Sequence, residues 1–523
     1  YKLCCTVKRY QQTMRKLILF LYFIVGCDGY KILGIFPHNG RSHNIYFTAL
    51  VEELAMRKHY VTVINYHLVP ALSTLRHISL QGEGNASDHD VNIEERLKFL
   101  TTSDFSKAYK GARACQRQAN TSCKQLMNNR EVQELIASAA HFDVVLVEQF
   151  VTDCGLAVAY NLNAPTIGIT THVLMPWTYS RLGAPNNPAY VPNRVVGYGT
   201  NPNLWNKIKS AIINFGINMY YTHVTQISDQ EIVNEVYPDT PLLEDLGKNM
   251  SLIMINQYFP LTGPRLYSAN VVEIGGMHIK ENVQIEDKGL QQFLRNANNG
   301  VVYISFGTVA SNFPRKVTNY IKKFVEKENS NNMLFVWKTD LIDWEPPRNV
   351  FIGKWMPQQA ILCHPKVVAF ITHYGMLSTS EALHCGVPIV GVPLFGDQYA
   401  NAQSAVESGL GVIVDILNLG QSALEDALHI ILQEKAKELS RVWKDRPLSP
   451  MDTAIFWIEY VARNKGAVNL KPPTVDMPLY QYLMLDVIFV VGSVFLLILL
   501  IVVKVVSLVI NKSLAQKSVK KEI

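Results

Sequence analysis

The 523-residue sequence lacks the short motifs that mark several common kinds of site. It contains no CxxC pair, which argues against a zinc centre or a thioredoxin-like redox site. It also has no Walker loop, no GxGxxG and no GxSxG, so kinase, dehydrogenase and hydrolase functions have no motif to support them. Low-complexity blocks and internal repeats are absent too. The formal net charge is only +6, and much of it lies near the two ends, which argues against a nucleic-acid groove.

The N-terminal end carries the pattern of a secretory signal. Basic residues at Arg15 and Lys16 precede the apolar run 17–25, and a small-residue exit follows at 26–29. A run of about ten apolar residues is too short to span a bilayer comfortably. We therefore predict a signal peptide at 14–29, with residues 1–13 a non-native extension and Met14 the true start. An uncleaved signal anchor is the alternative.

The C-terminal end predicts a transmembrane segment over residues 484–510. The run Val487–Val503 carries no charge and would be about 26 Å long as a helix. Asp486 precedes it, and lysines follow it, so the positive-inside rule places the tail 511–523 in the cytosol. Lys520 and Lys521 resemble a dilysine retrieval signal, which the COPI coat reads. We expect a single-pass type I protein of the endoplasmic reticulum membrane with its catalytic domains in the lumen.

Sequons and cysteines fit a translocated chain. Three sequons precede the predicted span, at Asn85, Asn120 and Asn249. Of the eight cysteines, Cys115 and Cys123 are close enough in sequence to form a disulfide in an oxidising lumen. Three more, Cys154, Cys363 and Cys385, are scattered in apolar settings.

Short apolar runs rich in β-branched residues alternate with helical patterns, which predicts two doubly wound α/β domains with buried parallel sheets. Strands are expected at 31–36, 60–64, 143–147, 165–169, 301–305, 334–337, 350–352, 368–371 and 388–392. The polar stretch 263–282 is the predicted linker between an N-terminal domain at 30–262 and a C-terminal domain at 283–447. A return helix and linker are expected at 448–483.

The segment from Phe370 to Gln398 closely resembles the signature of the UDP-glycosyltransferase family, often named UDP-glucuronosyltransferases. Further matches are Gly263-Pro-Arg265, Ile304-Ser-Phe-Gly-Thr308 and Trp355-Met-Pro-Gln358. The branch it most resembles is the animal microsomal one, and within it the arthropod members. The resemblance implies a GT-B architecture, with a UDP-sugar bound by the second domain and an acceptor by the first.

The resemblance also implies a set of donor contacts that needs no metal and no other cofactor. A strand end followed by a helix N-terminus offers free N–H groups to a diphosphate. Arg265 and His373 would add donors to the phosphates, Trp355 would stack on uracil, and Glu381 would accept from ribose hydroxyls. The full predicted set of donor-binding residues is Arg265, Ser305, Gly307, Thr308, Trp355, Gln358, His373, Gly375, Ser378, Glu381, Asp397 and Gln398. The DxD-like Asp88-His89-Asp90 lies in a polar loop, and we discard it as a metal site.

His43 matches the family's catalytic histidine, and an imidazole suits a general base because its pKa lies near working pH. The orienting acid falls at Glu148, where vertebrate relatives have aspartate; Asp153 is the fallback, and His38 is a nearby decoy. Tyr374 departs from the family pattern, which has a small residue there. We expect its phenol to be tolerated, although it stands where it could crowd the phosphate turn.

The sequence does not determine the acceptor or the sugar of the donor. Regions 68–140 and 170–194 are rich in apolar and aromatic residues, which favours small lipophilic alcohols and phenols and contact with membrane lipid. The donor is UDP-glucose or UDP-glucuronic acid. The expected reaction is inverting transfer to a hydroxyl, for detoxification or for hormone or pigment conjugation. The alternative is a catalytically weak binding or partner protein for hydrophobic ligands, and a homo- or hetero-oligomer stays open.

Overall fold

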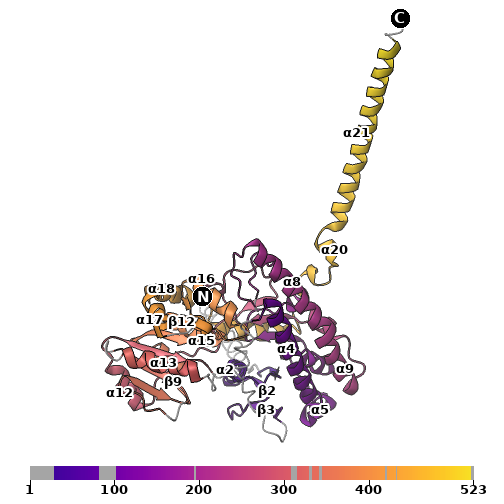
Figure 1. Cartoon of the computed structure of the whole chain (residues 1–523). Coiled ribbons are helices and arrows are strands. Elements are labelled where there is room, and N and C mark those ends of the chain that lie inside the picture. The colour runs from indigo at the N-terminus through magenta and orange to yellow at the C-terminus, as the bar shows by residue number, and fades with distance from the viewer. Residues whose placement is uncertain are drawn as a thin grey trace, which may run out of the picture. The chain divides into compact units, whose positions relative to one another are not determined.

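The computed structural model describes residues 29–81, 102–193, 196–307, 315–328, 333–340, 344–418, 421–431 and 433–519 (Figure 1). Residues 1–28 of the predicted extension and signal peptide, the sequon at Asn85, the segment Asp88-His89-Asp90 and the predicted dilysine pair Lys520-Lys521 lie outside these residues. The chain divides into two compact units, one ending at Lys471 and one beginning at Pro472.

The first unit contains two parallel sheets, which confirms the predicted fold class. The first sheet has the strand order β3-β2-β1-β4-β5-β6-β7. Its strands are β1 (Lys31–Ile35), β2 (Tyr60–Asn65), β3 (Leu75–Ser79), β4 (Val144–Glu148), β5 (Thr166–Thr170), β6 (Leu252–Ile255) and β7 (Val271–Glu273). The central strands are buried on both faces, as expected of a sheet covered by helices on each side.

The second sheet has the order β10-β9-β8-β11-β12-β13, again with all strands parallel. Its strands are β8 (Val301–Ser305), β9 (Leu334–Lys338), β10 (Val350–Gly353), β11 (Val367–Thr372), β12 (Ile389–Gly391) and β13 (Gly411–Ile413). β8 and β11 lie at its centre, so the chain segments that follow them emerge at the same edge of the sheet.

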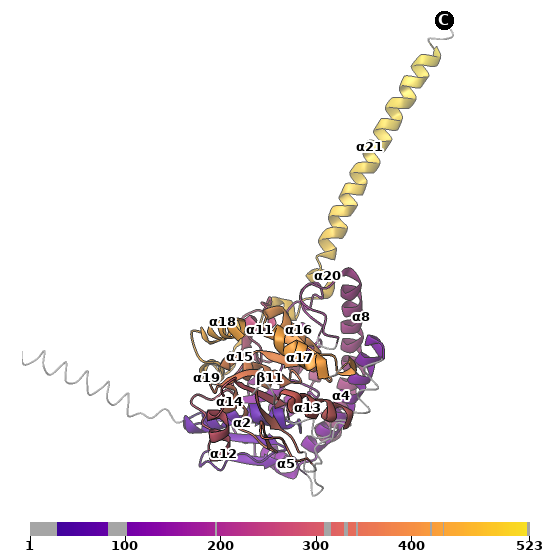
Figure 2. The same cartoon turned by 60° about the vertical axis from the view of Figure 1, so that its left-hand side comes forward.

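Helices connect and cover the strands in both domains (Figures 1 and 2). Those of the first domain are α2 (Arg41–Met56), α4 (Asp104–Met127), α5 (Arg130–Ala137), α6 (Cys154–Asn161), α7 (Thr178–Arg181), α8 (Leu204–Tyr220), α9 (Gln226–Val236), α10 (Leu243–Lys248) and α11 (Phe259–Thr262), with a π-helical turn, Tyr221–Thr225, between α8 and α9. Those of the second are α12 (Lys288–Arg295), α13 (Arg315–Lys327), α14 (Gln358–Leu362), α15 (Met376–Cys385), α16 (Gln398–Ser408), α17 (Gln421–Ile430) and α18 (Gln433–Lys444).

Every strand predicted from the sequence is present, and the short strands β3, β6, β7 and β13 were missed. β7 lies inside the predicted linker 263–282 and pairs with β6, so the first sheet extends into that segment. Val271 and Val272 are buried in this strand. The sequence analysis missed it because the residues around them are polar, which is typical of a linker.

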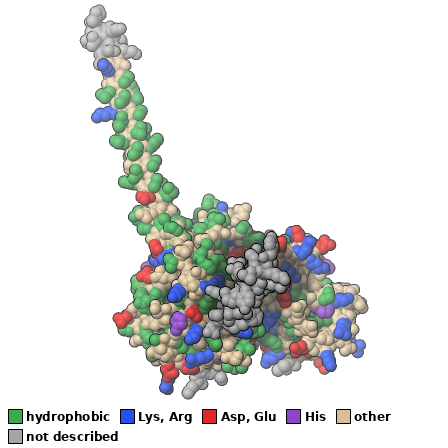
Figure 3. Space-filling view, turned by 180° about the vertical axis from the view of Figure 1, so that it is seen from behind, with side chains coloured by type: hydrophobic (Ala, Val, Ile, Leu, Met, Phe, Trp, Pro, Cys, Tyr) green, Lys and Arg blue, Asp and Glu red, His purple; other side chains and the backbone are tan. Residues whose placement is uncertain are grey.

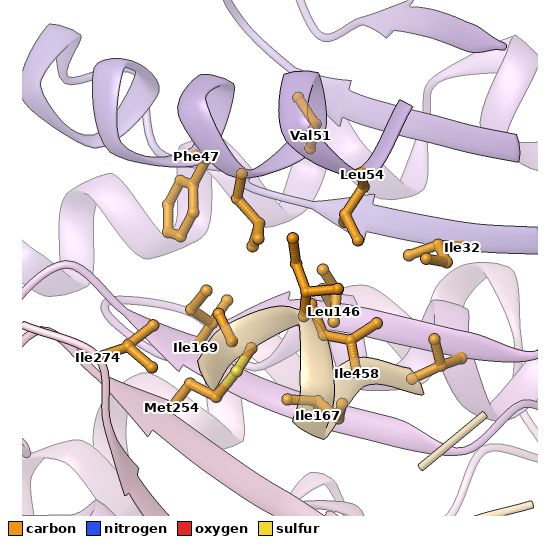
Figure 4. Packing of buried hydrophobic residues seen from close by; sticks show 14 of the residues in the cluster. Ile32, Phe47, Val51, Leu54, Leu146, Ile167, Ile169, Met254, Ile274 and Ile458 are labelled. Atoms are coloured by element: carbon orange, nitrogen blue, oxygen red, sulfur yellow. The ribbon is translucent and has the colours of Figure 1, made fainter. Parts of the chain in front are cut away.

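The last α-helix of the first unit, α19 (Pro450–Arg463), returns to the core of the first domain. Ile455, Ile458 and Val461 are buried with Leu146 and Ile167 from the first sheet, as Figure 4 shows for Ile458. Ser449 begins the helix by accepting a hydrogen bond from the N–H of Asp452, and proline follows at its first position. Residues far apart in the sequence therefore complete one hydrophobic core.

Two disulfides are formed among the described residues, and neither has the predicted pairing. Cys123 bridges to Cys154, with Cα atoms 5.5 Å apart, instead of to Cys115. Both half-cystines are buried where α4 packs on the start of α6, whereas Cys115 lies about two helical turns away along α4. Cys363 bridges to Cys385, joining α14 to the end of α15.

The second unit is dominated by α21 (Leu485–Val519). Its segment Leu485–Leu514 has a mean hydropathy of 3.1 and is long enough to cross a membrane. Figure 3 shows hydrophobic side chains along most of this helix, with basic side chains toward its far end. The helix therefore fits the predicted membrane anchor.

Candidate active site

A large cleft opens where the carboxyl ends of strands in the two sheets face each other. Its lining residues come from both domains, and its volume is about 1640 Å³. Pockets for one small molecule usually hold about 300–1,000 Å³. The cleft therefore has room for two substrates side by side.

His43 of the first domain lines this cleft, and the buried Glu148 contacts it from behind. His43 lies in the first turn of α2, and its Nδ1 is 2.5 Å from Oε1 of Glu148 at the end of β4. Glu148 is buried, and burial raises the pKa of its carboxyl to about 7. The hydroxyl of Thr171 lies 3.3 Å from Nε2 of His43. An ionised Glu148 accepts the proton of Nδ1, which leaves the lone pair of the imidazole on Nε2.

Neither neighbouring alternative takes the place of this pair. Asp153 forms a buried ion pair with Arg181, with 2.6 Å between Oδ2 and Nη2, so it is not the carboxylate that contacts His43. His38 stacks on the His43 ring with centroids 3.9 Å apart. Its Nδ1 accepts the N–H of Gly40, and burial lowers its pKa to about 3, so it stays neutral.

The second domain contributes the turn after β11. His373 directly follows this strand, is buried, and lines the cleft. Burial lowers its pKa to about 4, so the imidazole is neutral near pH 7 and can donate one N–H. Gly307 and Gly375 flank the ring: a Cβ on Gly307 would lie 2.6 Å from Cε1, and one on Gly375 would lie 2.7 Å from Nε2. Glycine is therefore required at both positions for this histidine to sit between the two turns.

Three more predicted residues form a hydrogen-bonded cluster beside this turn. Nε2 of Gln358 donates to Oγ of Ser378 at 2.9 Å and to Oε2 of Glu381 at 2.6 Å. His278, which the sequence analysis missed, lies with its Nε2 3.5 Å from Oε1 of Glu381. The cluster links the start of α14 to α15, and its residues are among those that line the cleft.

Lys338 is a further cleft residue that the sequence analysis missed. It is the last residue of β9, and its Nζ donates to the carbonyl of Gly307 at 3.2 Å. The same ammonium group lies 4.4 Å from the ring centroid of Trp355, which is 63% exposed and presents a flat face. Burial lowers the pKa of Lys338. Lys338 directly follows the predicted strand 334–337, and ligands of such sheets bind beyond the carboxyl ends of the strands, so this position could have identified it as a candidate site residue.

Asp397 and Gln398 lie past β12, at the start of α16, and both line the cleft. Oδ2 of Asp397 accepts a hydrogen bond from Nδ2 of Asn401 at 2.9 Å. Oε1 of Gln398 accepts the N–H groups of Leu394 and Phe395. The contacts of Gln398 tie the loop before α16 to the first turn of that helix.

Two predicted donor residues, Arg265 and Ser305, are not brought to the cleft wall. Arg265 lines a separate small cavity and donates to the carbonyls of Thr262 and Pro264. Ser305 is fully buried under the turn, with its Oγ 3.4 Å from the N–H of Gly307. Thr308 lies outside the described residues.

Tyr374 does not crowd the phosphate turn, contrary to the concern raised by its size. Its backbone has φ +60°, and its side chain is fully buried, pointing into the core of the second domain. The hydroxyl donates to the carbonyl of Val412 at 2.9 Å. Gly411 leaves room for it, since a Cβ there would lie 2.7 Å from the tyrosine hydroxyl.

Comparison with known proteins agrees with this arrangement. The family model described as "UDP-glucoronosyl and UDP-glucosyl transferase" matches residues 31–521. UDP-glycosyltransferase UGT5 of Dactylopius coccus is 31% identical over 92% of this chain and 94% of its own length. UDP-glucuronosyltransferase 1A3 of Rattus norvegicus is 28% identical over 95% of this chain and 95% of its own length.

Among solved structures, "Crystal Structure Analysis of the Glycotransferase of kitacinnamycin" is similar in fold. Its TM-score is 0.55 at 17% identity, covering 82% of this chain and 98% of that chain. This likeness supports the GT-B fold. The chain belongs to the UDP-glucuronosyl and UDP-glucosyl transferase family, and it is an enzyme that transfers a sugar from a UDP-sugar.

Proposed function

We propose that the enzyme transfers glucose or glucuronic acid to a hydroxyl group of a small lipophilic acceptor, with inversion at the anomeric carbon. The observation that carries this proposal is the 2.5 Å contact between His43 and Glu148 in the same cleft as His373. The product is a β-glycoside, because the donor linkage is α and one displacement inverts it.

His43 acts as the general base in this mechanism. Its Nε2 takes the proton of the acceptor hydroxyl while the acceptor oxygen forms a bond to the anomeric carbon. The bond between that carbon and the phosphate oxygen breaks, and UDP leaves with the electron pair. Glu148 stabilises the imidazolium that results and holds its Nδ1 proton.

The donor diphosphate lies in the turn after β11. The N-terminus of α15 directs free N–H groups to it, His373 donates a hydrogen bond, and Lys338 supplies the positive charge that the sequence analysis assigned to Arg265. Trp355 stacks on the uracil ring. Asp397 and Gln398 bind sugar hydroxyls.

The acceptor lies in the part of the cleft formed by the first domain. Ile45, Ala114 and Phe150 line it with apolar surface, and His172 and Gln118 add polar groups. This lining suits phenols and alcohols of plant toxins, pigments or hormones, which favours a role in detoxification or conjugation. We further propose that α21 anchors the enzyme in the endoplasmic reticulum membrane with its catalytic domains in the lumen, consistent with the basic residues that follow the span.

The test uses the full chain in microsomes with radiolabelled UDP-glucose or UDP-glucuronate and a panel of phenols. We expect His43→Ala to abolish transfer while UDP affinity, measured by calorimetry, is retained. Equal activity in the variant and the parent would remove His43 from the mechanism. Transfer that is absent from the parent with either donor would support the alternative, a membrane-bound protein that binds hydrophobic ligands without reaction.

A further inference from the structure

His38 is a second histidine in the cleft, and the mechanism described above gives it no role. It lies in the loop between β1 and α2, two residues before Gly40, and it lines the cleft together with His43. The two imidazole rings are stacked, with their centroids 3.9 Å apart and their planes 20° from parallel. Ring atoms at such separations are in van der Waals contact. The base therefore has a flat neighbour on one of its faces.

His38 is held in place by its own hydrogen bonds. Its Nδ1 accepts the N–H of Gly40 at 2.9 Å, which leaves its proton on Nε2. Gln118 of α4 forms a hydrogen bond with the same side chain, and Nε2 of Gln118 donates to Oδ1 of Asn39 at 3.2 Å. Gly40 leaves the room that the ring requires, because a Cβ there would lie 2.7 Å from Cε1 of His38. The ring is thus fixed both by its own loop and by α4.

His43 needs a support of this kind, because its hydrogen bond to Glu148 fixes only one atom of the ring. Nδ1 of His43 is 2.5 Å from Oε1 of Glu148, and a ring held there and at its Cβ can still rotate about the line between the two points. Phe150 contacts the same ring at a tilt of 38°, with 5.1 Å between the centroids. The parallel face of His38 sets the plane of the imidazole, and with it the direction of Nε2. Misplacing a reacting group by about 1 Å can cost about a hundredfold in rate.

His38 stays neutral while His43 changes its charge. Burial lowers the pKa of His38 to about 3, so this imidazole does not compete for the acceptor proton near neutral pH. When His43 becomes an imidazolium, its positive charge lies against the face of a neutral aromatic ring. Such a face attracts a cation, so the stack is stronger in the transition state than in the resting enzyme. The contact therefore contributes to kcat and not to binding of the UDP-sugar.

We propose that His38 is a positioning residue for the transfer reaction, which acts through the face of the catalytic imidazole. The inference rests on the proposed role of His43 as the general base. It deepens that role, because it assigns the alignment of Nε2 to a stacked ring in addition to the carboxylate of Glu148.

The test compares three variants of His38 in the detergent-solubilised full chain, with a phenol and the radiolabelled UDP-sugar that the parent uses. His38→Ala removes the ring, and His38→Asn keeps an acceptor for the Gly40 N–H but has no flat face. His38→Phe keeps the flat face and loses the hydrogen bonds. We expect His38→Ala and His38→Asn to lower kcat by about tenfold or more, with KM for the UDP-sugar within about twofold of the parent. His38→Phe should keep kcat within about threefold of the parent.

His59 provides the matched control. Its ring stacks on Tyr30 with centroids 5.8 Å apart, and its Nδ1 accepts the Tyr30 N–H at 3.1 Å, but it is not among the described residues that line the cleft. His59→Ala should therefore leave kcat within about twofold of the parent. UDP affinity measured by calorimetry shows that each variant is folded. The pair His38→Asn and His38→Phe carries the comparison where the alanine variant does not fold.

Three outcomes would overturn the proposal. One is a kcat within about threefold of the parent for both His38→Ala and His38→Asn. Another is a kcat for His38→Phe as low as that for His38→Ala, which would assign the effect to the hydrogen bonds. The third is a raised KM for the phenol with unchanged kcat, which would make His38 an acceptor contact. His43→Ala is measured alongside: if it is active, the proposed function itself fails, whereas an inactive His43→Ala with any of these outcomes overturns this inference alone.

Discussion

Replacing Glu148 with glutamine is expected to reduce kcat by about a thousandfold while leaving UDP affinity unchanged. The side chain keeps its shape but loses the charge that stabilises the protonated His43 at a contact of 2.5 Å. Two unit charges about 4 Å apart interact by about 4 kcal/mol at an effective dielectric constant of about 20. Since about 1.4 kcal/mol is worth a factor of ten in rate, this interaction corresponds to about three orders of magnitude.

The pH profile gives a second readout of the same change. Burial raises the pKa of Glu148 to about 7, so the carboxyl is ionised, and the pair is competent, above that pH. In the parent, kcat should therefore fall as pH drops below about 7. Glu148→Gln has no carboxyl to protonate and no charge to stabilise a protonated His43, so this limb of the profile should move to lower pH.

The assay is transfer from radiolabelled UDP-sugar to a phenol across pH 5 to 9, with UDP affinity followed by calorimetry. The exposed Glu134, which pairs with Arg130 on the surface, provides the control Glu134→Gln. The reasoning would be refuted if Glu148→Gln kept its rate within about threefold of the parent and titrated with the same pH profile.

Three further predictions concern the donor site and the core. Lys338→Met should weaken UDP binding about tenfold in calorimetry, because it removes a charge-assisted contact, whereas Arg265→Ala should leave it unchanged; the reverse order would show that Arg265 reaches the diphosphate. Tyr374→Phe should lower stability by about 1 kcal/mol and Tyr374→Ala by about 3–5 kcal/mol, since the ring is buried and its hydroxyl bonds to Val412; an unchanged midpoint in thermal unfolding of the detergent-solubilised chain would contradict this. Activity should survive EDTA, because the proposed mechanism takes its phosphate contacts from side chains and helix N–H groups alone; a loss that Mg²⁺ restores would contradict it.

The strands could be predicted where burial on both faces requires a continuous run of apolar residues. The strands at the centre of each sheet are buried on both faces, so β1 and β8 appear as short apolar runs. β3 is an edge strand that contains Arg76 and His77, and its partly exposed pattern hides it. β7 and β13 are only three residues long, and the residues around them are polar or glycine-rich, so neither strand gives a recognisable apolar run.

Candidate site residues could be predicted where a polar or titratable side chain lies at the carboxyl end of a strand. Glu148 ends β4 and His373 directly follows β11; His373 lines the cleft, and Glu148 contacts His43, which lines it too. Arg265 follows a short helix, and the orientation of its side chain is set by hydrogen bonds to the carbonyls of Thr262 and Pro264. These local contacts cannot be read from the sequence. The disulfide partner of Cys123 depends on where α6 packs against α4, which is a property of the assembled domain.

The return of α19 to the first domain has a consequence for synthesis of the chain. Ile455 and Ile458 fill a core whose other members begin at Ile32, so this core stays open until about residue 460 has left the ribosome. At about 5–20 residues per second, the interval after the last strand of the first sheet is completed lasts about ten seconds or more. A chain truncated before α19 would expose that core permanently, so we expect premature stops in the second domain to yield aggregation-prone products.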